Sequence, residues 1–448
     1  MNLVQDVLKK HFDNNFLVQG SLLYTYKELG LAVDLLCVEI TKKHYMGGVV
    51  ALESENCFSC YVKLLALLNS NIPFMLLPSY QFNDHTYRKL LETEIKSSVI
   101  YFSKVENLAE INFDPKAKTH NEISTALKRG DQPFIVRTSG TSGFKYKFIL
   151  HNASLFFNKF AKVGAHFKIT FAFSPLESIA GIETLLETVF NGAGLVTAVD
   201  SFNPHDIATL ISQNAVDYFQ TTPSFLNLFL LSGQIQKHNL SSLKKIAYGS
   251  EPVMPATTAA LKKALPEVIL MHTYGMSEIG ILKTETNQDE PFKLKINSTF
   301  NPSRIINGLI EVQSLTPMIA YLNYENQSLD WFKTGDAAQE FGDYIQVLGR
   351  EGDLINIAGR KFFPAELEEL LMQMPQISDV SIIKEANPVL GSAITAKVFL
   401  VSDVDQDLFK INFKSFCEES LPRYMHPQRL IISDLPLSNS RHKKVRSV

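Results

Sequence analysis

The chain has 448 residues, of which 45% are hydrophobic and 20% charged, and its formal net charge at pH 7 is −3. A chain of this length is too long for one ordinary hydrophobic core, so we expect two or three domains. The nearly balanced charge argues against nucleic acid or an anionic membrane surface as the main partner.

The N-terminal segment, MNLVQDVLKKHFDNN, contains no apolar stretch of the kind found in signal peptides. No segment reaches the ~18 apolar residues of a membrane span, so we expect a cytoplasmic protein without one. Cys57 and Cys60 form a single C-x-x-C pair, whereas a zinc site would need a second pair and a redox site a thioredoxin-like setting. We therefore interpret these cysteines as small apolar residues packed in a helix.

Helical and strand-like patterns alternate along most of the chain. Residues 26–44 have helical apolar spacing, and residues 47–54 (GGVVALES) form an apolar run after two glycines. Residues 59–71 are helical again, and residues 72–77 (IPFMLL) are extended. This rhythm predicts an α/β fold, with a large N-terminal domain of packed mixed or parallel sheets covered by helices.

The clearest domain boundary lies at residues 349–353, where the strand-like YIQVLGR ends. A helix over 366–374, with Pro364 in its first turn, then precedes two strand patterns (VSIIKE and ITAKVFLV) and the helical DLFKINFKSFCEES. We therefore expect a core at 1–349, a connection at 350–353 and a small α+β C-terminal domain at 354–448.

The segment RTSGTSGFKYKFI (137–149) places small hydroxyl residues and glycines between two strand-like runs. Glycines let backbone N–H groups approach phosphate, hydroxyls add donors, and Lys145 and Lys147 add positive charge. The spacing does not satisfy a Walker A loop. The motif indicates either a phosphate-binding loop or an exposed polar turn in a hairpin.

Two further motifs carry groups suited to a nucleotide. In HTYGMSEIG, Tyr274 can stack on adenine, and Glu278 can bind Mg²⁺, although a plain strand–turn–helix would have the same pattern. In the segment 331–353, Asp336 can bind ribose hydroxyls and Arg350 can support ribose and phosphate. The alternative interpretations are that Asp336 is a turn residue after glycine and that Arg350 is a solvated charge.

The order of these motifs resembles the adenylate-forming (AMP-binding) superfamily of acyl- and aryl-CoA synthetases, luciferases and nonribosomal peptide adenylation domains. Seven stretches in family order carry the resemblance over nearly the whole chain: LYTYKELGLAVDLL with VVALESENCFSCYVKLLALL, RTSGTSGFKYK, TTPSFLNLF with IAYGSEPV, YGMSE, KTGD, GREGDLINIAGRKFFPAELEELL and LPRYMHPQRLIISDLPLSNSRHKKVR. The chain is most similar in type to a stand-alone acid–thiol ligase.

The resemblance implies two reactions under one mobile C-terminal lid. A small carboxylic acid attacks the α-phosphorus of ATP, with Mg²⁺ bound, to give an acyl-adenylate and pyrophosphate. The lid then turns, and the thiol of coenzyme A or of a carrier protein's phosphopantetheine takes the acyl group and releases AMP. The implied assembly is a monomer or a homodimer.

The resemblance also assigns residue roles. Pyrophosphate contacts fall to Thr138, Ser139, Gly140, Thr141, Ser142, Gly143 and Lys147. The adenine side falls to Gly249, Ser250, Glu251, Tyr274 and Gly275, the α-phosphate to Ser277, the metal to Glu278, and the ribose to Asp336 with Arg350. Gly352 takes the hinge position, and Gly359 the loop that enters the site for thioester formation.

The catalytic lysine of the C-terminal tail is expected at Lys443, three residues before Arg446, with Lys444 as the rival. There it would bridge the carboxylate and the α-phosphate and stabilise charge in the transition state. The alternative is a basic tail without a catalytic role.

Three positions depart from the family pattern. Tyr146 stands at the usual phosphate-loop lysine, Ser178 at a histidine of many acyl-CoA ligases, and Gly352 at the usual Asp or Lys of the hinge. These departures leave open a degenerate protein that binds nucleotide or acyl-adenylate without turnover. A ligase specific for a carrier protein is also open.

The acid itself is weakly specified. Ile179 stands where amino-acid-activating relatives place an aspartate, which argues against a free α-amino acid. Phe173, Ser178, Gly181 and Ile182 are expected to line the acid pocket. Glu177 and Glu183 lie near and could bind a polar substrate, but helix-surface charges are the better interpretation. The pattern favours an aromatic or a short-to-medium acyl acid.

Overall fold

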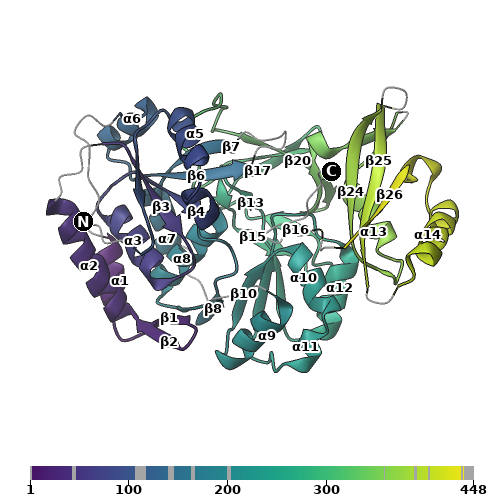
Figure 1. Ribbon diagram of the computed structural model, residues 1–448, viewed down its shortest axis with the longest axis horizontal. Coiled ribbons are helices and arrows are strands. Elements are labelled where there is room, and N and C mark those ends of the chain that lie inside the picture. Colours follow the sequence, from purple (N-terminus) through teal and green to yellow (C-terminus); the bar gives the residue numbers. More distant parts are fainter. Residues whose placement is uncertain are drawn as a thin grey trace.

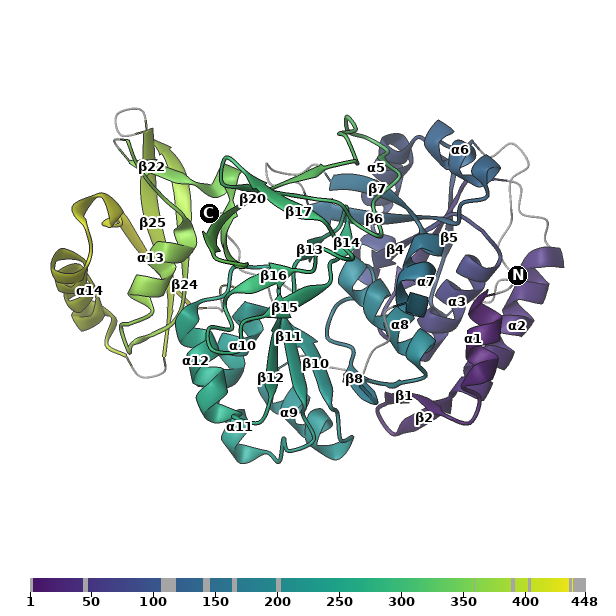
Figure 2. The same cartoon turned by 180° about the vertical axis from the view of Figure 1, so that it is seen from behind.

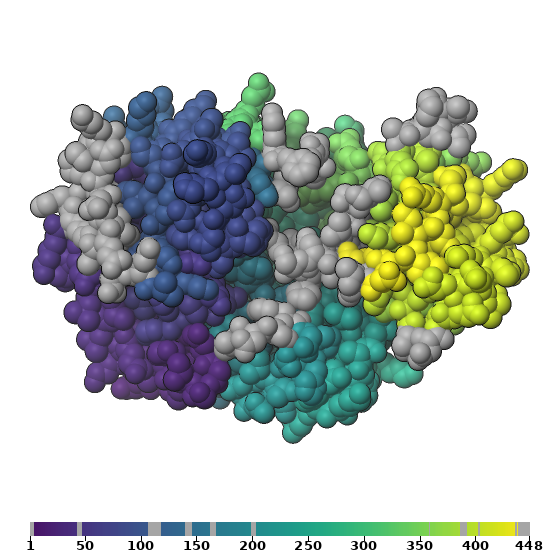
Figure 3. Space-filling view, in the orientation of Figure 1, coloured from purple at the N-terminus to yellow at the C-terminus, as the bar shows by residue number. Residues whose placement is uncertain are grey.

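The computed structural model describes residues 3–42, 47–105, 118–139, 146–162, 167–198, 203–357, 359–387, 391–401, 404–434 and 437. Two large sheets with their helices form the body of the molecule, and a small C-terminal part lies at the end opposite the N-terminal helices (Figures 1 and 3). The α/β fold with a large N-terminal and a small C-terminal part is confirmed. None of the described helices is long and apolar enough to cross a membrane.

The first sheet has six strands in the order β19-β7-β6-β4-β3-β5. Its strands are β3 (Val49–Ser54), β4 (Phe74–Pro78), β5 (Val99–Phe102), β6 (Pro133–Ser139), β7 (Tyr146–Asn152) and β19 (Ala320–Tyr321). The helices of this half of the chain are α3 (Phe58–Asn69), α4 (Ser79–Phe82), α5 (His85–Ile95), α6 (Asn121–Arg129), α7 (Ala153–Lys162) and α8 (Ile179–Asn191). Strands β3, β4, β5 and β6 run parallel, which explains why β3 is buried along its whole length.

The second sheet has seven strands in the order β12-β11-β10-β8-β9-β1-β2. Its strands are β1 (Asn15–Gln19), β2 (Leu22–Thr25), β8 (Ile169–Phe171), β9 (Gly194–Thr197), β10 (Tyr218–Thr221), β11 (Lys245–Tyr248) and β12 (Ile269–His272). The helices beside it are α1 (Leu3–Lys10), α2 (Tyr26–Lys42), α9 (Pro204–Gln213), α10 (Pro223–Leu231), α11 (Gln234–Lys237) and α12 (Pro255–Ala264). A shared core joins the two halves, because Phe134 of the first sheet, Leu195 of the second and Leu186 of α8 belong to one buried cluster.

A third, antiparallel sheet follows in the order β15-β16-β21-β20-β18-β17 (Figure 2). Its strands are β15 (Thr284–Thr286), β16 (Leu294–Ile296), β17 (Ser303–Ile306), β18 (Leu309–Val312), β20 (Phe332–Phe341) and β21 (Tyr344–Arg350). A short hairpin of β13 (Gly275–Met276) and β14 (Gly280–Ile281) precedes it. The residues after Ser277 therefore form a turn that leads into β14, where a helix start was the alternative considered from the sequence.

The C-terminal part has its own core, in which Ile355, Leu367, Val398 and Phe413 are buried together. Its elements are the 3-10 helix η2 (Glu351–Asp353), β22 (Ile355–Ile357), β23 (Arg360–Phe362), α13 (Pro364–Leu371), β24 (Ile377–Asn387), β25 (Gly391–Leu400), α14 (Gln406–Ser420), the 3-10 helix η3 (Arg423–Met425) and β26 (Arg429–Ser433). The predicted helix after Pro364 is present and begins two residues earlier than expected, at Pro364 itself.

Candidate active site

Tyr274, Asp336 and Arg350 meet at one carboxylate although they are far apart in the sequence. Antiparallel pairing of β20 with β21 sets Asp336 opposite Arg350. The Arg350 Nε atom lies 2.7 Å from Asp336 Oδ1, and the Tyr274 hydroxyl donates to Asp336 Oδ2 at 2.7 Å. Burial raises the pKa of Asp336, and the Arg350 guanidinium opposes that rise. The carboxylate is thus preorganised as an acceptor, as ribose hydroxyls require.

A cavity of about 210 Å³ opens beside this carboxylate. Its lining includes six of the predicted nucleotide residues: Ser250, Glu251, Tyr274, Gly275, Asp336 and Arg350. Glu251 accepts hydrogen bonds from the backbone and hydroxyl of Ser224, at 3.3 and 2.7 Å, which ties this wall to α10. Gly249 permits close packing here, because a Cβ at this position would lie 2.4 Å from the Thr273 carbonyl oxygen.

Ser277 and Glu278 occupy the turn of the β13–β14 hairpin. The Glu278 side chain is buried, and its Oε1 accepts a hydrogen bond from the Tyr321 hydroxyl at 2.9 Å. The His151 Nε2 atom lies 2.7 Å from the Ser277 carbonyl oxygen. Burial lowers the pKa of His151 to about 4, so the ring is neutral at pH 7 and donates to that oxygen. Two residues of other segments therefore hold the turn in place.

The chemistry of Glu278 fits a magnesium ion, because Mg²⁺ prefers oxygen ligands and is commonly bound by one or two carboxylates together with phosphate oxygens. Tyr321 occupies only one carboxylate oxygen, and among the described residues no donor is hydrogen-bonded to the other. No cluster of three or more His, Cys, Asp or Glu side chains able to hold a metal occurs in the described part of the chain.

The strands that flank the phosphate motif pair antiparallel, with Thr138 opposite Lys147. The Lys147 ammonium lies over the Tyr321 ring at 5.1 Å and over the Tyr324 ring at 5.3 Å from the centroids. Lys147 therefore adjoins the tyrosine that holds Glu278. Ser139 ends β6. The loop positions Gly140, Thr141, Ser142, Gly143 and Lys145 lie outside the described residues, as do Lys443 and Lys444.

A second cavity, of about 130 Å³, lies on the α8 side of the hairpin. Its lining includes Phe173, Pro175, Ser178, Ile179, Ala180, Gln220, Gly249, Met276, Ser277 and Ile281. Of the residues predicted to line the acid pocket, Phe173 and Ser178 line this cavity, whereas Gly181 and Ile182 do not. A Cβ on Gly181 would lie 2.2 Å from the Pro175 carbonyl oxygen, and Ile182 turns into the core, since only the first turn of α8 faces the cavity.

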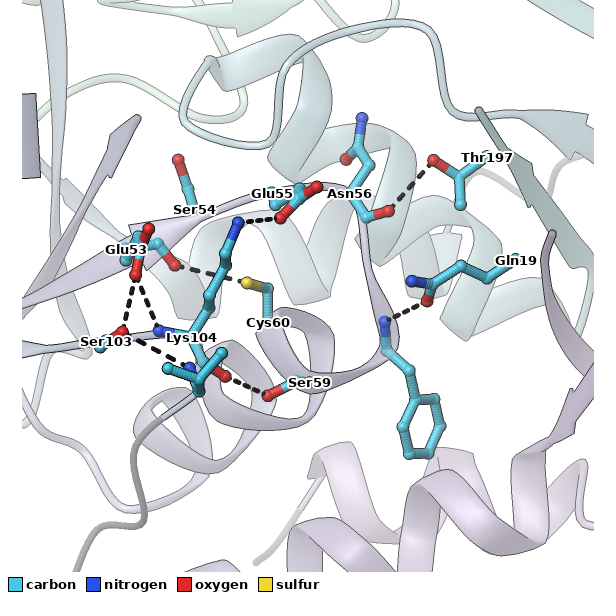
Figure 4. A network of polar contacts seen from close by, with 12 residues as sticks. Gln19, Glu53, Ser54, Glu55, Asn56, Ser59, Cys60, Ser103, Lys104 and Thr197 are labelled. Carbon is cyan, nitrogen blue, oxygen red and sulfur yellow. Dashed lines mark hydrogen bonds and ion pairs between the residues drawn. The ribbon is translucent and has the colours of Figure 1, made fainter. Parts of the chain in front are cut away.

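The wall that carries Phe173 is held by Asn56, which sequence reasoning missed. The Asn56 amide donates to the carbonyl oxygens of Ala172 and Ser174, at 3.2 and 3.1 Å. The Thr197 hydroxyl donates to the Asn56 carbonyl oxygen at 3.1 Å (Figure 4). An asparagine before a helix is an ordinary loop residue in sequence, so no local signal marked it.

The predicted hinge residue Gly352 lies within η2, between β21 and β22. A Cβ added to it would meet no atom within 4 Å. Lys384 of β24 donates to the carbonyl oxygens of Gly352 and Leu354, at 3.3 and 2.9 Å. Gly359 lies in the turn between β22 and β23, where its N–H donates to Asn356 Oδ1 at 3.0 Å.

Comparison with known families decides the classification. The model of the AMP-binding enzyme family matches residues 4–299. The chain belongs to the AMP-binding enzymes. The resemblance inferred from the motifs, and the expectation that the protein is an enzyme of this class, are therefore confirmed.

Relatives of this AMP-binding enzyme include a 2-succinylbenzoate–CoA ligase of Staphylococcus aureus strain bovine RF122 / ET3-1, which is 25% identical over an alignment of 361 positions that covers 72% of this chain and 69% of the relative. Among solved structures, the o-succinylbenzoate CoA synthetase of Bacillus subtilis with its acyl-adenylate superposes with a TM-score of 0.74 at 18% identity, covering 99% of this chain and 97% of the other. An ATP-bound chimera, titled RpMatB-BxBclM chimera B1, gives 0.79 at 17% identity, covering 98% and 97%. These likenesses show the fold of the whole chain.

Proposed function

We propose that this AMP-binding enzyme activates a small carboxylic acid with ATP and transfers the acyl group to the thiol of coenzyme A. The observation that carries the proposal is the junction of the two cavities. The nucleotide-side cavity and the α8-side cavity share Ser250, Thr273 and Gly275 in their linings. A carboxylate held in one cavity would therefore meet the α-phosphate of a nucleotide held in the other.

In the first reaction, a carboxylate oxygen of the acid attacks the α-phosphorus, and the bond to the pyrophosphate oxygen breaks. Asp336 would accept hydrogen bonds from the ribose, while Arg350 and Tyr274 keep its two oxygens in place. Bound Mg²⁺ would neutralise phosphate charge and polarise the attacked phosphorus. Glu278 would hold that ion, and Ser277 would contact the α-phosphate. Lys443 of the tail would bridge the reacting groups.

In the second reaction, a thiolate attacks the acyl carbon, and the bond to the AMP phosphate oxygen breaks. The proposed hinge at 350–353 would let the C-terminal domain serve both steps. Coenzyme A is the favoured acceptor, because the named relative and two of the fold neighbours are titled as CoA ligases or synthetases. A carrier protein's phosphopantetheine is the alternative. Discharge of the adenylate by coenzyme A alone would distinguish the two.

The α8-side cavity supports an aromatic or short-to-medium acid. Phe173, Ile179 and Met276 supply apolar surface, and Gln220 supplies a polar group. The Ser178 hydroxyl instead caps α8, donating to the Pro175 carbonyl oxygen at 2.7 Å and accepting from the Gly181 N–H at 3.0 Å. A fold neighbour of 16% identity is titled as an anthranilate CoA ligase with bound anthranoyl-AMP. The curated relatives are named for 2-succinylbenzoate, so both aryl acids belong in a substrate screen.

Acid-dependent exchange of labelled pyrophosphate into ATP tests the proposal, with aryl, fatty, dicarboxylic and amino acids as candidates. Exchange with one class, which Glu278→Gln weakens at limiting Mg²⁺, would support adenylation and name the acid. ATP binding without exchange for any acid would favour the degenerate nucleotide-binding protein, for which Tyr146 in place of the usual lysine is the motive. Absence of ATP binding would overturn both functions.

A further inference from the structure

A buried ion pair joins α7 and α8 behind the hairpin. Lys159 of α7 and Glu183 of α8 are in direct contact, and their side chains are only 12% and 4% exposed. The same two side chains bind the backbone of Ile281 in β14. Glu183 Oε1 accepts from the Ile281 N–H at 2.7 Å, and Lys159 Nζ donates to the Ile281 carbonyl oxygen at 2.7 Å. Glu183 is therefore neither a surface charge nor a free polar group of the acid pocket.

The need for this pair follows from the hairpin. Strand β14 pairs with β13 on one side only, within the two-stranded sheet. The N–H and C=O of Ile281 face the other side, towards α7 and α8, where a buried backbone group without a partner is costly. Lys159 and Glu183 supply the donor and the acceptor that a third strand would otherwise provide. The two opposite charges also compensate one another in this buried position.

The hairpin packs closely against Glu183 and Thr316 at Gly280. Gly280 adopts a φ of +71°, and a Cβ there would lie 2.6 Å from Glu183 Oε1 and 2.5 Å from Thr316 Oγ1. Thr316 also donates to the Ile279 carbonyl oxygen at 2.9 Å. The three residues that follow Glu278 are thus held by Lys159, Glu183 and Thr316.

Ile281 also connects the hairpin with the proposed acid pocket. Ile281 lines both the α8-side cavity and a third cavity, which is also lined by Lys159 and Glu183. Helix α8 supplies Ile179 and Ala180 to the acid wall from its first turn, and Glu183 follows one turn later. One rigid helix therefore carries both the acid wall and the carboxylate that grips β14.

We propose that Lys159 and Glu183 are positioning residues that fix the magnesium-binding turn of the hairpin relative to the acid wall on α8. This inference rests on the proposed function, because it gives Ser277 and Glu278 their roles. His151 of β7 and Tyr321 of β19 hold the turn from the first sheet, and the ion pair holds it from the helices. Neither Lys159 nor Glu183 is required to touch ATP or the acid.

Lys159→Met tests this role, because it keeps the length of the side chain but removes its charge and its donors. We expect kcat for acid-dependent pyrophosphate exchange to fall about tenfold and half-saturating Mg²⁺ to rise several-fold, since a displaced turn misplaces Glu278. Lys159→Arg keeps a cation and donors and should recover most of both values. Glu183→Gln keeps an acceptor for Ile281 without the charge and should have an intermediate effect.

The matched control is Lys295→Met, which removes an exposed ion pair between Lys295 of β16 and Asp343. It should leave kcat and the magnesium titration unchanged. A lower thermal midpoint of Lys159→Met with wild-type kcat and magnesium dependence would reduce the pair to a purely structural role and overturn the inference. If Lys159→Met does not fold, the magnesium titrations of Glu183→Gln and Lys159→Arg decide by the same criterion.

The failure of this inference can be told apart from failure of the proposed function. If the wild-type chain shows no exchange with any acid, the proposed function fails. The positioning role is then measured by calorimetry, as the magnesium dependence of ATP binding in the wild type and in Lys159→Met. A weaker magnesium dependence only in the variant supports it, and equal dependence overturns it.

Discussion

Tyr274 and Asp336, which lie 62 residues apart, share a hydrogen bond of 2.7 Å in the interior of the candidate site. The phenol belongs to the segment just before the hairpin that carries Glu278, and the carboxylate belongs to the third sheet. The bond therefore connects two segments that line the same cavity. The other carboxylate oxygen, Asp336 Oδ1, is paired with Arg350, so each oxygen has its own donor.

Tyr274→Phe keeps the ring for stacking and removes only the donor. We expect KM for ATP to rise about tenfold, because a hydrogen bond to a charged group contributes about 1.5–3 kcal/mol. Loss of this hydrogen bond would also raise the pKa of Asp336 further, because the bond from Tyr274 opposes the rise that burial causes. Tyr248→Phe is the control, since its buried hydroxyl donates to the Pro291 carbonyl oxygen at 2.7 Å and lines neither the nucleotide-side nor the α8-side cavity. An unchanged KM in Tyr274→Phe would remove Asp336 from ATP binding.

Glu278→Gln tests the magnesium assignment. The amide keeps the size of the side chain and an acceptor for Tyr321, but it removes the negative charge that would attract the cation. Half-saturating Mg²⁺ in the exchange reaction should rise about tenfold, which corresponds to about 1.4 kcal/mol. Glu285→Gln, an exposed carboxylate bound to Asn297 at 2.8 Å, should leave the titration unchanged. Superimposable titrations of wild type and Glu278→Gln would show that another group binds the metal.

Local patterns were enough to predict several elements in the first part of the chain. The runs at 47–54 and 72–77 lie on β3 and β4, and the helical spacing at 26–44 lies on α2, because apolar periodicity reports which face of an element is buried. The motif residues Tyr274, Asp336 and Arg350 were named separately from composition and resemblance. Their meeting at one carboxylate depends on the register of β20 with β21, which no local pattern contains.

Glu183 shows where sequence reasoning could not reach. An isolated glutamate in a helix is usually exposed, because burying its charge without a partner is costly. Here the compensating charge is Lys159, which comes from the preceding helix. The other hydrogen-bond partner of Glu183 is the backbone N–H of Ile281. A signal existed in part, since the segment IAGIETLLETVFN is apolar around most of the helix and carries two glutamates one turn apart. Such a pattern indicates buried carboxylates with partners elsewhere.

Lys443→Ala tests the tail, which only the sequence supports. We expect adenylation to fall at least about a hundredfold, because a lysine that bridges the carboxylate and the α-phosphate stabilises charge as it develops. Thiolysis of supplied acyl-adenylate should remain nearly intact, since in that step the thiolate attacks the acyl carbon and no bond to phosphorus forms. Lys444→Ala is the control and should have little effect. If Lys444→Ala instead causes the loss, the role moves to that neighbour, and equal loss of both half-reactions in Lys443→Ala would indicate misfolding.

Glu187, one turn beyond Glu183, makes stability depend on pH. Burial raises the pKa of Glu187 from 4.5 to about 7, and Lys159 opposes that rise. Between these two values the folded chain keeps a proton that the unfolded chain has released, so the free energy of unfolding falls as pH rises from about 4.5 to about 7. Above pH 7 the carboxylate is charged in both states, and the full penalty is present.

Glu187→Gln copies the protonated side chain at every pH and therefore removes this penalty. The variant should exceed the wild type in free energy of unfolding by up to about 3 kcal/mol at pH 8, and the difference should shrink towards zero near pH 4.5. Urea unfolding at several pH values measures it. Comparing the two chains cancels other titrating groups, including His151, whose lowered pKa acts in the opposite direction over pH 4–6.5. A difference that stays constant with pH would mean that Glu187 keeps its ordinary pKa because water hydrates its carboxylate.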